Sequence, residues 1–263
     1  MIKTEIMGIL NITPDSFYDG NSNMIHSKNV LEEKLVLLNK ASIIDIGCES
    51  SRPGSKPISI NEELDRLKII NNVNFNNKTL SIDSYKPEVI EHCLNHGFKI
   101  VNDISGGGVN FKNINIANKY NSKIILMHMK GSPMNMQNSP RYANVIDEIN
   151  RFFDERITYC KKIGMSTKNI ILDPGIGFGK TIEHNDQILL NLNEFKHFNC
   201  KILVGLSRKS FLSVDNDKPK SRLYQSLASG AIASFLGADI LRVHDVRETY
   251  LMLKIINRFK AYG

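Results

Sequence analysis

The chain has 263 residues, a formal net charge of +7 and a hydrophobic content of 41%, values ordinary for a soluble globular protein that can bury a substantial core. It has no apolar run of about 18 residues, so we expect no membrane contact, and its start leaves no room for a signal peptide. The lysines are dispersed and there is no arginine-rich arm, so the charge permits an anionic ligand but does not indicate nucleic acid. The four cysteines lack metal-ligand spacing, which predicts reduced thiols in the cytoplasm.

Short apolar segments rich in β-branched residues alternate along the chain with amphipathic segments. The apolar segments are residues 5–12, 42–48, 79–84, 100–105, 123–129, 169–175, 201–207 and 238–246. Short continuous apolar runs are typical of parallel strands that are buried on both faces. Because helical segments separate them, we expect one α/β domain over residues 1–263, a single (β/α)8 TIM barrel. A doubly wound open sheet is the structural alternative.

Local signals support helices in three of the intervening segments. Residues 59–73 open with Ser59 and Glu62, the two side chains of a capping box, and carry an apolar face as far as Val73. Pro87 stands where the first turn of a helix tolerates proline. The third helix is predicted over residues 246–259, with Val246, Tyr250, Leu253 and Ile256 on one face.

Each predicted strand ends in polar or charged residues. These are Asn11, Asp45, Glu49, Asp83, Asn102, Asp103, His128, Asp173, residues 207–209, Arg242 and His244. One such end is ordinary, because Asp and Asn favour turns. In a TIM barrel, however, the carboxyl ends of all the strands meet at one mouth, where the active sites of this fold lie. The pattern therefore predicts a single polar site.

The segment LDPGIGFGKT, residues 172–181, ends in the way that a phosphate-binding P-loop ends. That motif requires a glycine at position 174, where this chain has Pro174. A proline there removes a backbone N–H that a phosphate would need. The segment therefore does not predict a nucleotide site, and its polar strand-end residue, Asp173, is the better candidate for function.

Eight segments resemble dihydropteroate synthase, and the similarity covers nearly the whole chain. They are GILNITPDSFYDG (8–20), DIGCESSRPGS (45–55), SIDSYKPEVI (81–90), VNDISGG (101–107), LMHMKGSPMNMQ (126–137), LDPGIGFGKT (172–181), VGLSRKSFL (204–212) and RVHDV (242–246). One segment would be a weak indication, but eight in order, each at a strand end, are specific. The resemblance implies a TIM barrel that condenses 6-hydroxymethyl-7,8-dihydropterin pyrophosphate with 4-aminobenzoate. The products are 7,8-dihydropteroate and pyrophosphate, in folate biosynthesis, and the family is a sulfonamide target.

The resemblance also implies a pterin site. The matching residues are Asp83, Asn102, Asp173, Phe178 and Lys209. A carboxylate can accept paired donors from the pyrimidinone edge of a pterin, which suits Asp173, and Lys209 would donate to the pterin carbonyl. The glycines around Phe178 would let its ring lie near the flat pterin. Two alternative interpretations remain. In one, Asp173 only caps the turn before Pro-Gly; in the other, Asp45, which also matches an acidic position, is a buried residue with a structural role.

The departing pyrophosphate needs positive charge. Arg242 and His244 are two apart on the last predicted strand, so they should point to one face and donate to the phosphates. The alternative is a salt bridge of Arg242 with Asp245 or Glu248. Asn11 matches the Mg²⁺ contact of the family, which also needs phosphate oxygens and water.

The family implies an SN1-like path in which pyrophosphate leaves before the amine attacks. Such a path needs no nucleophile, because catalysis is electrostatic. The expected catalytic residues are Asp83, Lys209, Arg242 and His244.

Two loops, residues 9–20 and 50–58, are rich in Gly, Pro and Ser, and we expect them to close over bound substrate. The resemblance assigns Phe17, Ser51, Arg52, Pro53 and Ser210 to binding of 4-aminobenzoate and the phosphates. Ser210 would begin the helix after the seventh strand, and a helix N-terminus attracts a carboxylate. Ser51 replaces the commoner threonine, and Cys48 replaces the usual glycine as a small packed residue.

Three other functions are considered. A methyltetrahydrofolate methyltransferase that acts with a corrinoid partner would share Asp83, Asn102 and Asp173, but it has no use for a pyrophosphate site at Arg242. A non-catalytic pterin- or folate-binding protein would keep the pocket without turnover, and binding of nucleic acid is the weakest possibility. The family further implies a homodimer formed through the later helices, and the chain leaves no room for a fused pyrophosphokinase.

Overall fold

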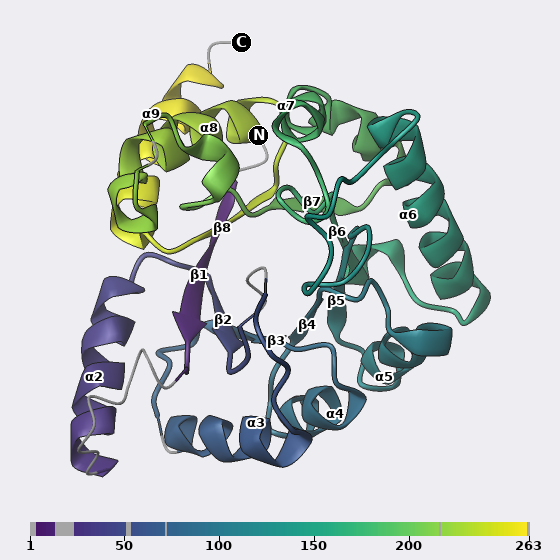
Figure 1. Cartoon of the computed structure of the whole chain (residues 1–263). Helices are drawn as coiled ribbons and strands as arrows, with labels where there is room; N and C mark the ends of the chain where they lie inside the picture. The colour runs from purple at the N-terminus through teal and green to yellow at the C-terminus, as the bar shows by residue number, and fades with distance from the viewer. Residues whose placement is uncertain (1–3, 14–23, 51–53, 72, 216, 262–263) are drawn as a thin grey trace.

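The computed structural model describes residues 4–13, 24–50, 54–71, 73–215 and 217–261. In it, each parallel strand pairs with the next and the last pairs with the first, which closes a barrel (Figure 1). The strands are β1 (Glu5–Asn11), β2 (Ile43–Gly47), β3 (Thr79–Asp83), β4 (Ile100–Asp103), β5 (Lys123–Met127), β6 (Ile170–Asp173), β7 (Lys201–Val204) and β8 (Ile240–Val243). The closed barrel confirms the predicted fold and excludes the open sheet.

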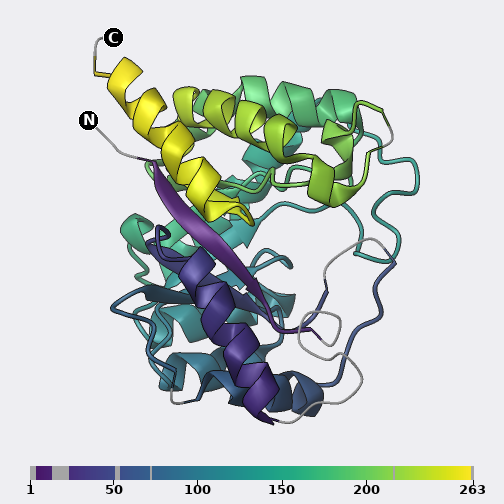
Figure 2. The same ribbon diagram turned by 90° about the vertical axis from the view of Figure 1, so that its left-hand side faces the viewer.

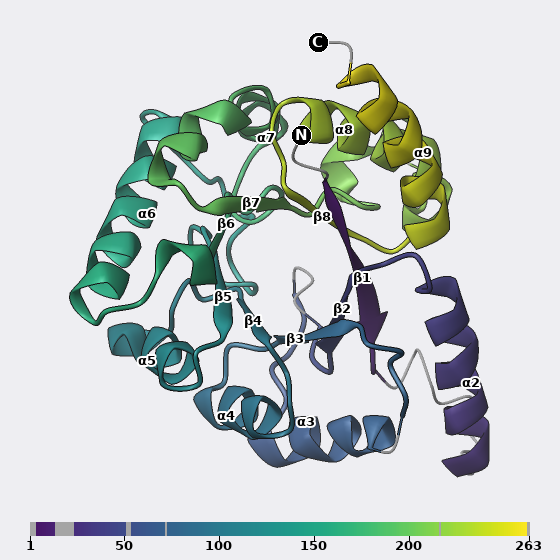
Figure 3. The same cartoon turned by 180° about the vertical axis from the view of Figure 1, so that it is seen from behind.

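Helices surround the ring of strands, as the view from behind also shows (Figure 3). The α-helices are α2 (Met24–Leu37), α3 (Ile60–Leu67), α4 (Pro87–Asn95), α5 (Lys112–Lys119), α6 (Val145–Lys162), α7 (Ile182–Leu190), α8 (Leu223–Phe235) and α9 (Val246–Phe259). The 3-10 helices are η1 (Lys68–Ile70), η2 (Val109–Phe111), η3 (Thr167–Asn169), η4 (Leu192–Phe198), η5 (Ser210–Leu212) and η6 (Pro219–Ser221). Among the described residues, no helix combines the length and the apolar character that a bilayer crossing requires.

The predicted strands are all present, but each ends before its predicted boundary. β7, for example, ends at Val204 and β8 at Val243, whereas the apolar runs suggested ends at 207 and 246. The pairing stops there because the chain turns into the loops of the mouth at its polar residues, which favour turns over a continued ladder. The polar residues therefore lie among the last residues of each strand or just beyond its end.

The helix that follows the second strand is shorter than predicted. Ser59 caps α3, since its hydroxyl accepts a hydrogen bond from the Glu62 N–H at 3.2 Å. The return half of the capping box is absent, because the Glu62 carboxylate pairs with Arg66 at 2.6 Å instead. The α-helix ends at Leu67 and continues only as the single turn η1, after which the backbone of Asn71 is extended.

The other two helix predictions are confirmed. Pro87 is the first residue of α4, where its missing N–H has no partner to lose. Helix α9 begins at Val246 and ends at Phe259, as predicted, and it buries Val246 and Leu253 against the barrel. Helices α8 and α9 lie side by side on the outside of the barrel, next to β1 (Figure 2).

The inside of the barrel has an apolar layer below a polar one. The apolar cluster consists of Met7, Ile43, Ile100, Ile125, Ile171, Leu203 and Ile240, and Ser81 of β3 stands in register with Ile100. Side chains alternate between the two faces of a strand, so the residues two positions further on also face inward. Among them are Asp45, Asp83, Asn102, Asp173 and Arg242. The strand period thus places five polar side chains at the mouth.

Candidate active site

Arg242 joins the acidic groups of the mouth. Its Nε donates to Oδ2 of Asp45 at 2.7 Å, and its Nη2 donates to Oδ2 of Asp83 at 2.6 Å. Nδ2 of Asn102 donates to the same oxygen of Asp45 at 2.8 Å. A guanidinium suits this position because its donors form a fixed planar fork. These bonds connect the ends of β2, β3, β4 and β8 across the mouth.

The partners of Arg242 differ from those suggested by the sequence. Asp245, the first proposed partner, instead binds Arg208, with Nη2 and Oδ1 2.5 Å apart. Arg242 turns inward because its side chain follows the inward face of β8, whereas Asp245 lies beyond the strand. Within the described residues, Nη1 of Arg242 makes no hydrogen bond, so this nitrogen can still donate to a ligand.

Burial changes the protonation of Asp83, one of the two carboxyls beside Arg242. Desolvation raises the pKa of Asp83 to about 7, with Arg242 acting to lower it and Asp45 to raise it. Asp45 is fully buried, and its Oδ1 has no hydrogen-bond partner among the described residues. Asp45 is therefore part of the buried network, as its structural interpretation requires, and it retains one acceptor oxygen.

Asp173 lies at the end of β6 with 8% of its surface exposed. Its Oδ1 accepts a hydrogen bond from the Gly175 N–H at 2.7 Å, so the turn contact proposed as the alternative is present. Oδ2 makes no hydrogen bond to the described residues and can accept from a ligand. Burial raises the pKa of Asp173, while Lys209 and the Gly175 N–H act to lower it.

Lys209 and Phe178 form a wall next to Asp173. The Lys209 ammonium donates to the carbonyl oxygen of Ile176, and its nitrogen lies 4.6 Å from the centre of the Phe178 ring. Burial lowers the pKa of Lys209 to about 8, while Asp173 acts to raise it. The turn after β6 and the segment after β7 thus bring a cation, a carboxylate and an aromatic ring together.

The lysine of the P-loop-like segment is buried in this turn. Lys180 is 3% exposed, and its ammonium donates to backbone carbonyl oxygens of Gly175 and Phe178 at 2.9 and 3.0 Å. Its sequence context predicted no function for it, because the segment does not match the nucleotide-binding motif. The only signal was a lysine that directly follows three alternate glycines.

Three predicted residues lie at the rim of the mouth. Asn11 is the half-buried last residue of β1. His244 follows β8 rather than lying within it, and its Nδ1 is 3.1 Å from Oγ of Ser207. Ser210 is exposed and begins a helix as expected, but that helix is η5, a 3-10 helix of three residues, and not an α-helix. Helix α8 starts only at Leu223, because Ser213, Asp215, Asp217 and Pro219 favour turns.

Four predicted residues, Phe17, Ser51, Arg52 and Pro53, lie outside the described residues. The chain on either side of 51–53 belongs to the mouth. The N–H of Gly54 donates to the carbonyl of Pro133 at 3.3 Å, which joins the segment after β2 to the segment after β5.

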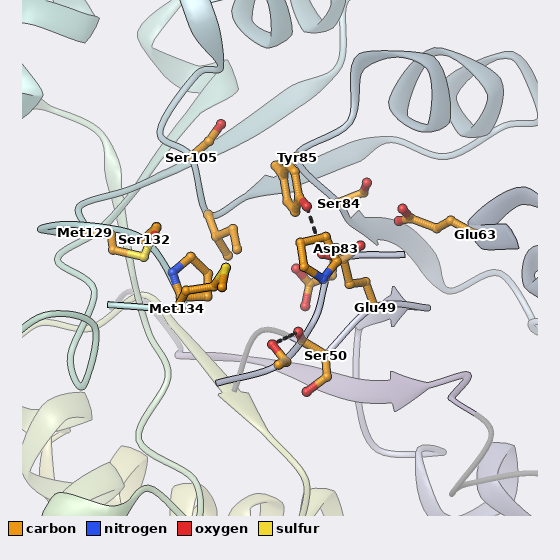
Figure 4. A pocket seen from close by; sticks show the side chains of 14 residues that line it. Glu49, Ser50, Glu63, Asp83, Ser84, Tyr85, Ser105, Met129, Ser132 and Met134 are labelled. Atoms are coloured by element: carbon orange, nitrogen blue, oxygen red, sulfur yellow. Dashed lines mark hydrogen bonds between the residues drawn. The ribbon is translucent and has the colours of Figure 1, made fainter. Parts of the chain in front are cut away.

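A cavity of about 310 Å³ opens beside Asp83 (Figure 4). Met129 and Met134 line one side and Tyr85 lines the other, so most of its wall is apolar. The Tyr85 hydroxyl donates to Oε1 of Glu49 at 2.9 Å. Lys86 lies between Glu49 and the buried Glu63 and pairs with both. The cavity extends the polar floor of the mouth with a wall that suits a flat ring.

Known proteins match this chain over almost its full length. The family described as pterin binding enzyme matches residues 7–244. A dihydropteroate synthase of Escherichia coli strain K12 is 41% identical over 257 residues, which cover 95% of this chain and 90% of the relative. The structure of Yersinia pestis dihydropteroate synthase with a sulfonamide drug is 39% identical, with a TM-score of 0.89 over 98% of this chain and 95% of that one. Xanthomonas albilineans dihydropteroate synthase with 4-aminobenzoic acid is 32% identical, with a TM-score of 0.88 over 98% and 94%.

Proposed function

The chain belongs to the family of pterin-binding enzymes and is a dihydropteroate synthase, and from this premise we propose how its barrel mouth performs the reaction. The substrates are 6-hydroxymethyl-7,8-dihydropterin pyrophosphate and 4-aminobenzoate, and the products are 7,8-dihydropteroate and pyrophosphate. The observation that supports the proposal best is the inward polar layer of Asp83, Asn102 and Asp173 around Arg242. These groups provide the acceptors and donors that the edge of a pterin requires.

The pterin binds with its pyrimidinone edge toward the floor of the mouth. Oδ2 of Asp173 accepts from the ring N–H and amino donors, because this oxygen has no hydrogen-bond partner among the described residues. Asp83 and Asn102 complete the set of polar contacts, and Lys209 donates to the carbonyl of the ring. Phe178, which lies beside Lys209, flanks the plane of the bound ring.

The reaction is dissociative. The bond between the pterin methylene and the pyrophosphate oxygen breaks first, and the leaving group takes the electron pair. The amine of 4-aminobenzoate then attacks the methylene cation and loses a proton. The mouth favours this cation electrostatically, because the carboxyl groups of Asp45, Asp83 and Asp173 lie in its inward polar layer. Arg242 through Nη1, and His244 at the rim, donate to the departing pyrophosphate.

Mg²⁺ is the cofactor of this proposal, and Asn11 is its contact in the protein. In the part of the chain that the structure describes, no three His, Cys, Asp or Glu side chains form a metal cluster. A single amide oxygen suits Mg²⁺ only when phosphate oxygens and water complete the coordination. The donor set therefore fits an ion that would bind together with the pyrophosphate ester, and such an ion would supply positive charge to the leaving group.

The second substrate binds at the rim. The Xanthomonas albilineans structure contains 4-aminobenzoic acid and the Yersinia pestis structure a sulfonamide drug, which supports one subsite for both ligands here. Ser210 is exposed beside Lys209 and can donate its hydroxyl to the benzoate. Phe17, Ser51, Arg52 and Pro53 complete this subsite in the proposal.

The proposed assembly is a homodimer through α8 and α9. Helix α8 exposes Tyr224, Ile232 and Phe235, and α9 exposes Leu251, Ile255 and Phe259. These residues are spaced by multiples of three or four, and the two helices pack side by side. An exposed apolar surface of this kind favours burial against a second copy.

The four cysteines are free and buried, which supports a location in the reducing cytoplasm.

The test is release of pyrophosphate from the dihydropterin ester in the presence of Mg²⁺, with and without 4-aminobenzoate. We expect release to increase with 4-aminobenzoate and to yield one dihydropteroate for each pyrophosphate. Binding of the ester with no release under either condition would contradict the proposal and favour a non-catalytic pterin-binding protein. Methyl transfer to a corrinoid protein, in place of pyrophosphate release, would favour the methyltransferase.

A further inference from the structure

The turn between β6 and α7 contains a buried cation that the proposed reaction does not use. Lys180 donates to the carbonyl oxygens of Gly175 at 2.9 Å, Phe178 at 3.0 Å and His128 at 3.2 Å. Among the described residues, none of its hydrogen bonds goes to a carboxylate. A buried ammonium without a carboxylate partner is costly to maintain. Its role therefore lies in the backbone segments whose carbonyl groups it binds.

The three carbonyl groups belong to two segments that press against each other. A Cβ atom on Gly175 would lie 1.9 Å from the carbonyl oxygen of His128, and one on Gly179 would lie 2.3 Å from that of Lys130. The turn after β6 therefore lies flat on the segment after β5. Lys180 occupies the point where their carbonyl oxygens converge, and its N–H groups offset the repulsion between those oxygens. Its nitrogen is also 3.1 Å from Nδ1 of His128.

Two candidate active-site groups depend on the conformation of this turn. Gly175, whose carbonyl Lys180 holds, donates its N–H to Oδ1 of Asp173. The carbonyl of Ile176, which lies between the two clamped residues Gly175 and Phe178, accepts the hydrogen bond of Lys209. A change in the turn would therefore displace a carboxylate and a cation of the mouth together.

We propose that Lys180 is a positioning residue of dihydropteroate synthesis, whose ammonium clamps the β6–α7 turn so that Asp173 and Lys209 face the pterin. This inference rests on the proposed pterin contacts of those two residues. It assigns Lys180 no contact with substrate. Its effect passes through the backbone of the turn and through its positive charge.

The charge of Lys180 gives the proposal a readout in pH. Lys180 is one of the groups that lower the pKa of Asp173 against the effect of burial. The other charged groups that act on this pair are Lys209 and Arg242. Burial lowers the pKa of Lys180 to about 7 and that of His128 to about 3, so below neutrality Lys180 is charged and His128 remains neutral down to acid pH. Without the ammonium, Asp173 becomes protonated at higher pH and stops accepting from the pterin.

The experiment is calorimetric titration of the protein with 6-hydroxymethylpterin between pH 5 and 7. This ligand has the recognition edge but no leaving group, so it cannot react. We expect Lys180→Met to weaken binding about 10-fold at pH 7 and to move the acid midpoint of binding to higher pH. Lys180→Gln keeps two N–H donors, so it should weaken binding less but move the midpoint as far. Lys168→Met, an exposed lysine just before β6, is the matched control and should change neither.

A double-mutant cycle separates positioning from a general loss of structure. If Lys180 acts through Lys209, Lys180→Met should cost much less in a Lys209→Met background than in the wild type. Additive losses with an unmoved acid midpoint would overturn the inference, as would wild-type binding by both Lys180 variants. If Lys180→Met does not fold, the acid midpoint of pterin binding to Lys180→Gln tests the inference instead. A wild-type protein that binds no pterin would instead contradict the proposed function itself.

Discussion

At the residue scale, the mouth contains two groups whose charge changes close to neutral pH. Asp83 has a pKa raised to about 7 by burial, and Lys209 has one lowered to about 8. The two shifts have the same cause, since loss of water disfavours the charged form of either group. Function needs both charged, because Asp83 has to accept hydrogen bonds and Lys209 has to donate them.

We therefore predict a bell-shaped pH dependence of kcat/KM, which reports on the free enzyme. Activity should fall as the pH drops below about 7, where Asp83 gains a proton, and fall again above about 8, where Lys209 loses one. The measurement is initial rates of pyrophosphate release from pH 5.5 to 9.5 in buffers of constant ionic strength. A flat profile through this range would show that neither group has to be charged.

Arg242 controls the acid side of that profile. Replacement by lysine keeps the charge but loses the fork that reaches Asp45 and Asp83 together. We predict that Arg242→Lys lowers kcat/KM about 100-fold and the free energy of unfolding by about 2 kcal/mol. The acid limb should also move to higher pH, because Asp83 loses a stabilising partner. Arg258→Lys on the exposed face of α9 is the control, and equal behaviour of the two variants would contradict the prediction.

At the scale of elements, the β6–α7 turn has the strictest backbone requirements near the site. Gly175, Gly177 and Gly179 all have positive φ angles, of 68°, 83° and 62°. Gly175 has a second constraint, since a side chain there would collide with the backbone of His128. The glycines that resemble a P-loop thus serve close packing between two backbone segments rather than the binding of phosphate.

A pair of matched glycine variants tests this. Gly164, after α6, also has a positive φ of 79°, but no atom of the described residues lies within 4 Å of the place where its Cβ would be. We predict that Gly164→Ala lowers the free energy of unfolding by about 1 kcal/mol, whereas Gly175→Ala lowers it by about 3 kcal/mol or more and abolishes pterin binding. Urea denaturation of both variants gives the comparison. Similar losses would mean that the turn can move away from the segment after β5.

At the scale of the whole molecule, helices α8 and α9 lie on the outer wall of the barrel (Figure 2), and both expose apolar residues. Strands end at the mouth, so a second copy on this wall would leave the site open. The proposed dimer therefore stabilises the barrel without covering the substrates.

We predict that Phe235→Asp converts the dimer to a monomer, because it places a charge in the apolar contact. Leu37→Asp on α2, where the wild-type side chain is 69% exposed, should leave the assembly unchanged. Sedimentation equilibrium of the wild type and the two variants provides the measurement. A wild-type monomer at micromolar concentration would contradict the proposed assembly.

The sequence by itself determined the architecture and the location of the site. Both follow from local chemistry, because the alternation of apolar and amphipathic segments specifies strands and helices, and polar residues end each strand where the chain has to turn. Asp83, Asn102 and Asp173 could therefore be predicted as neighbours at one mouth. The resemblance to a known family added their roles.

Only the tertiary structure decided how these residues are paired and charged. Arg242 and Asp45 are 197 positions apart, and Lys180 and His128 are 52 apart, so no local pattern indicates either contact. The raised pKa of Asp83 and the lowered pKa of Lys209 likewise result from loss of water inside the closed barrel. Desolvation and the approach of distant groups are properties of the packed molecule, and for that reason the sequence could place the polar residues at the mouth but could not predict their partners or their protonation.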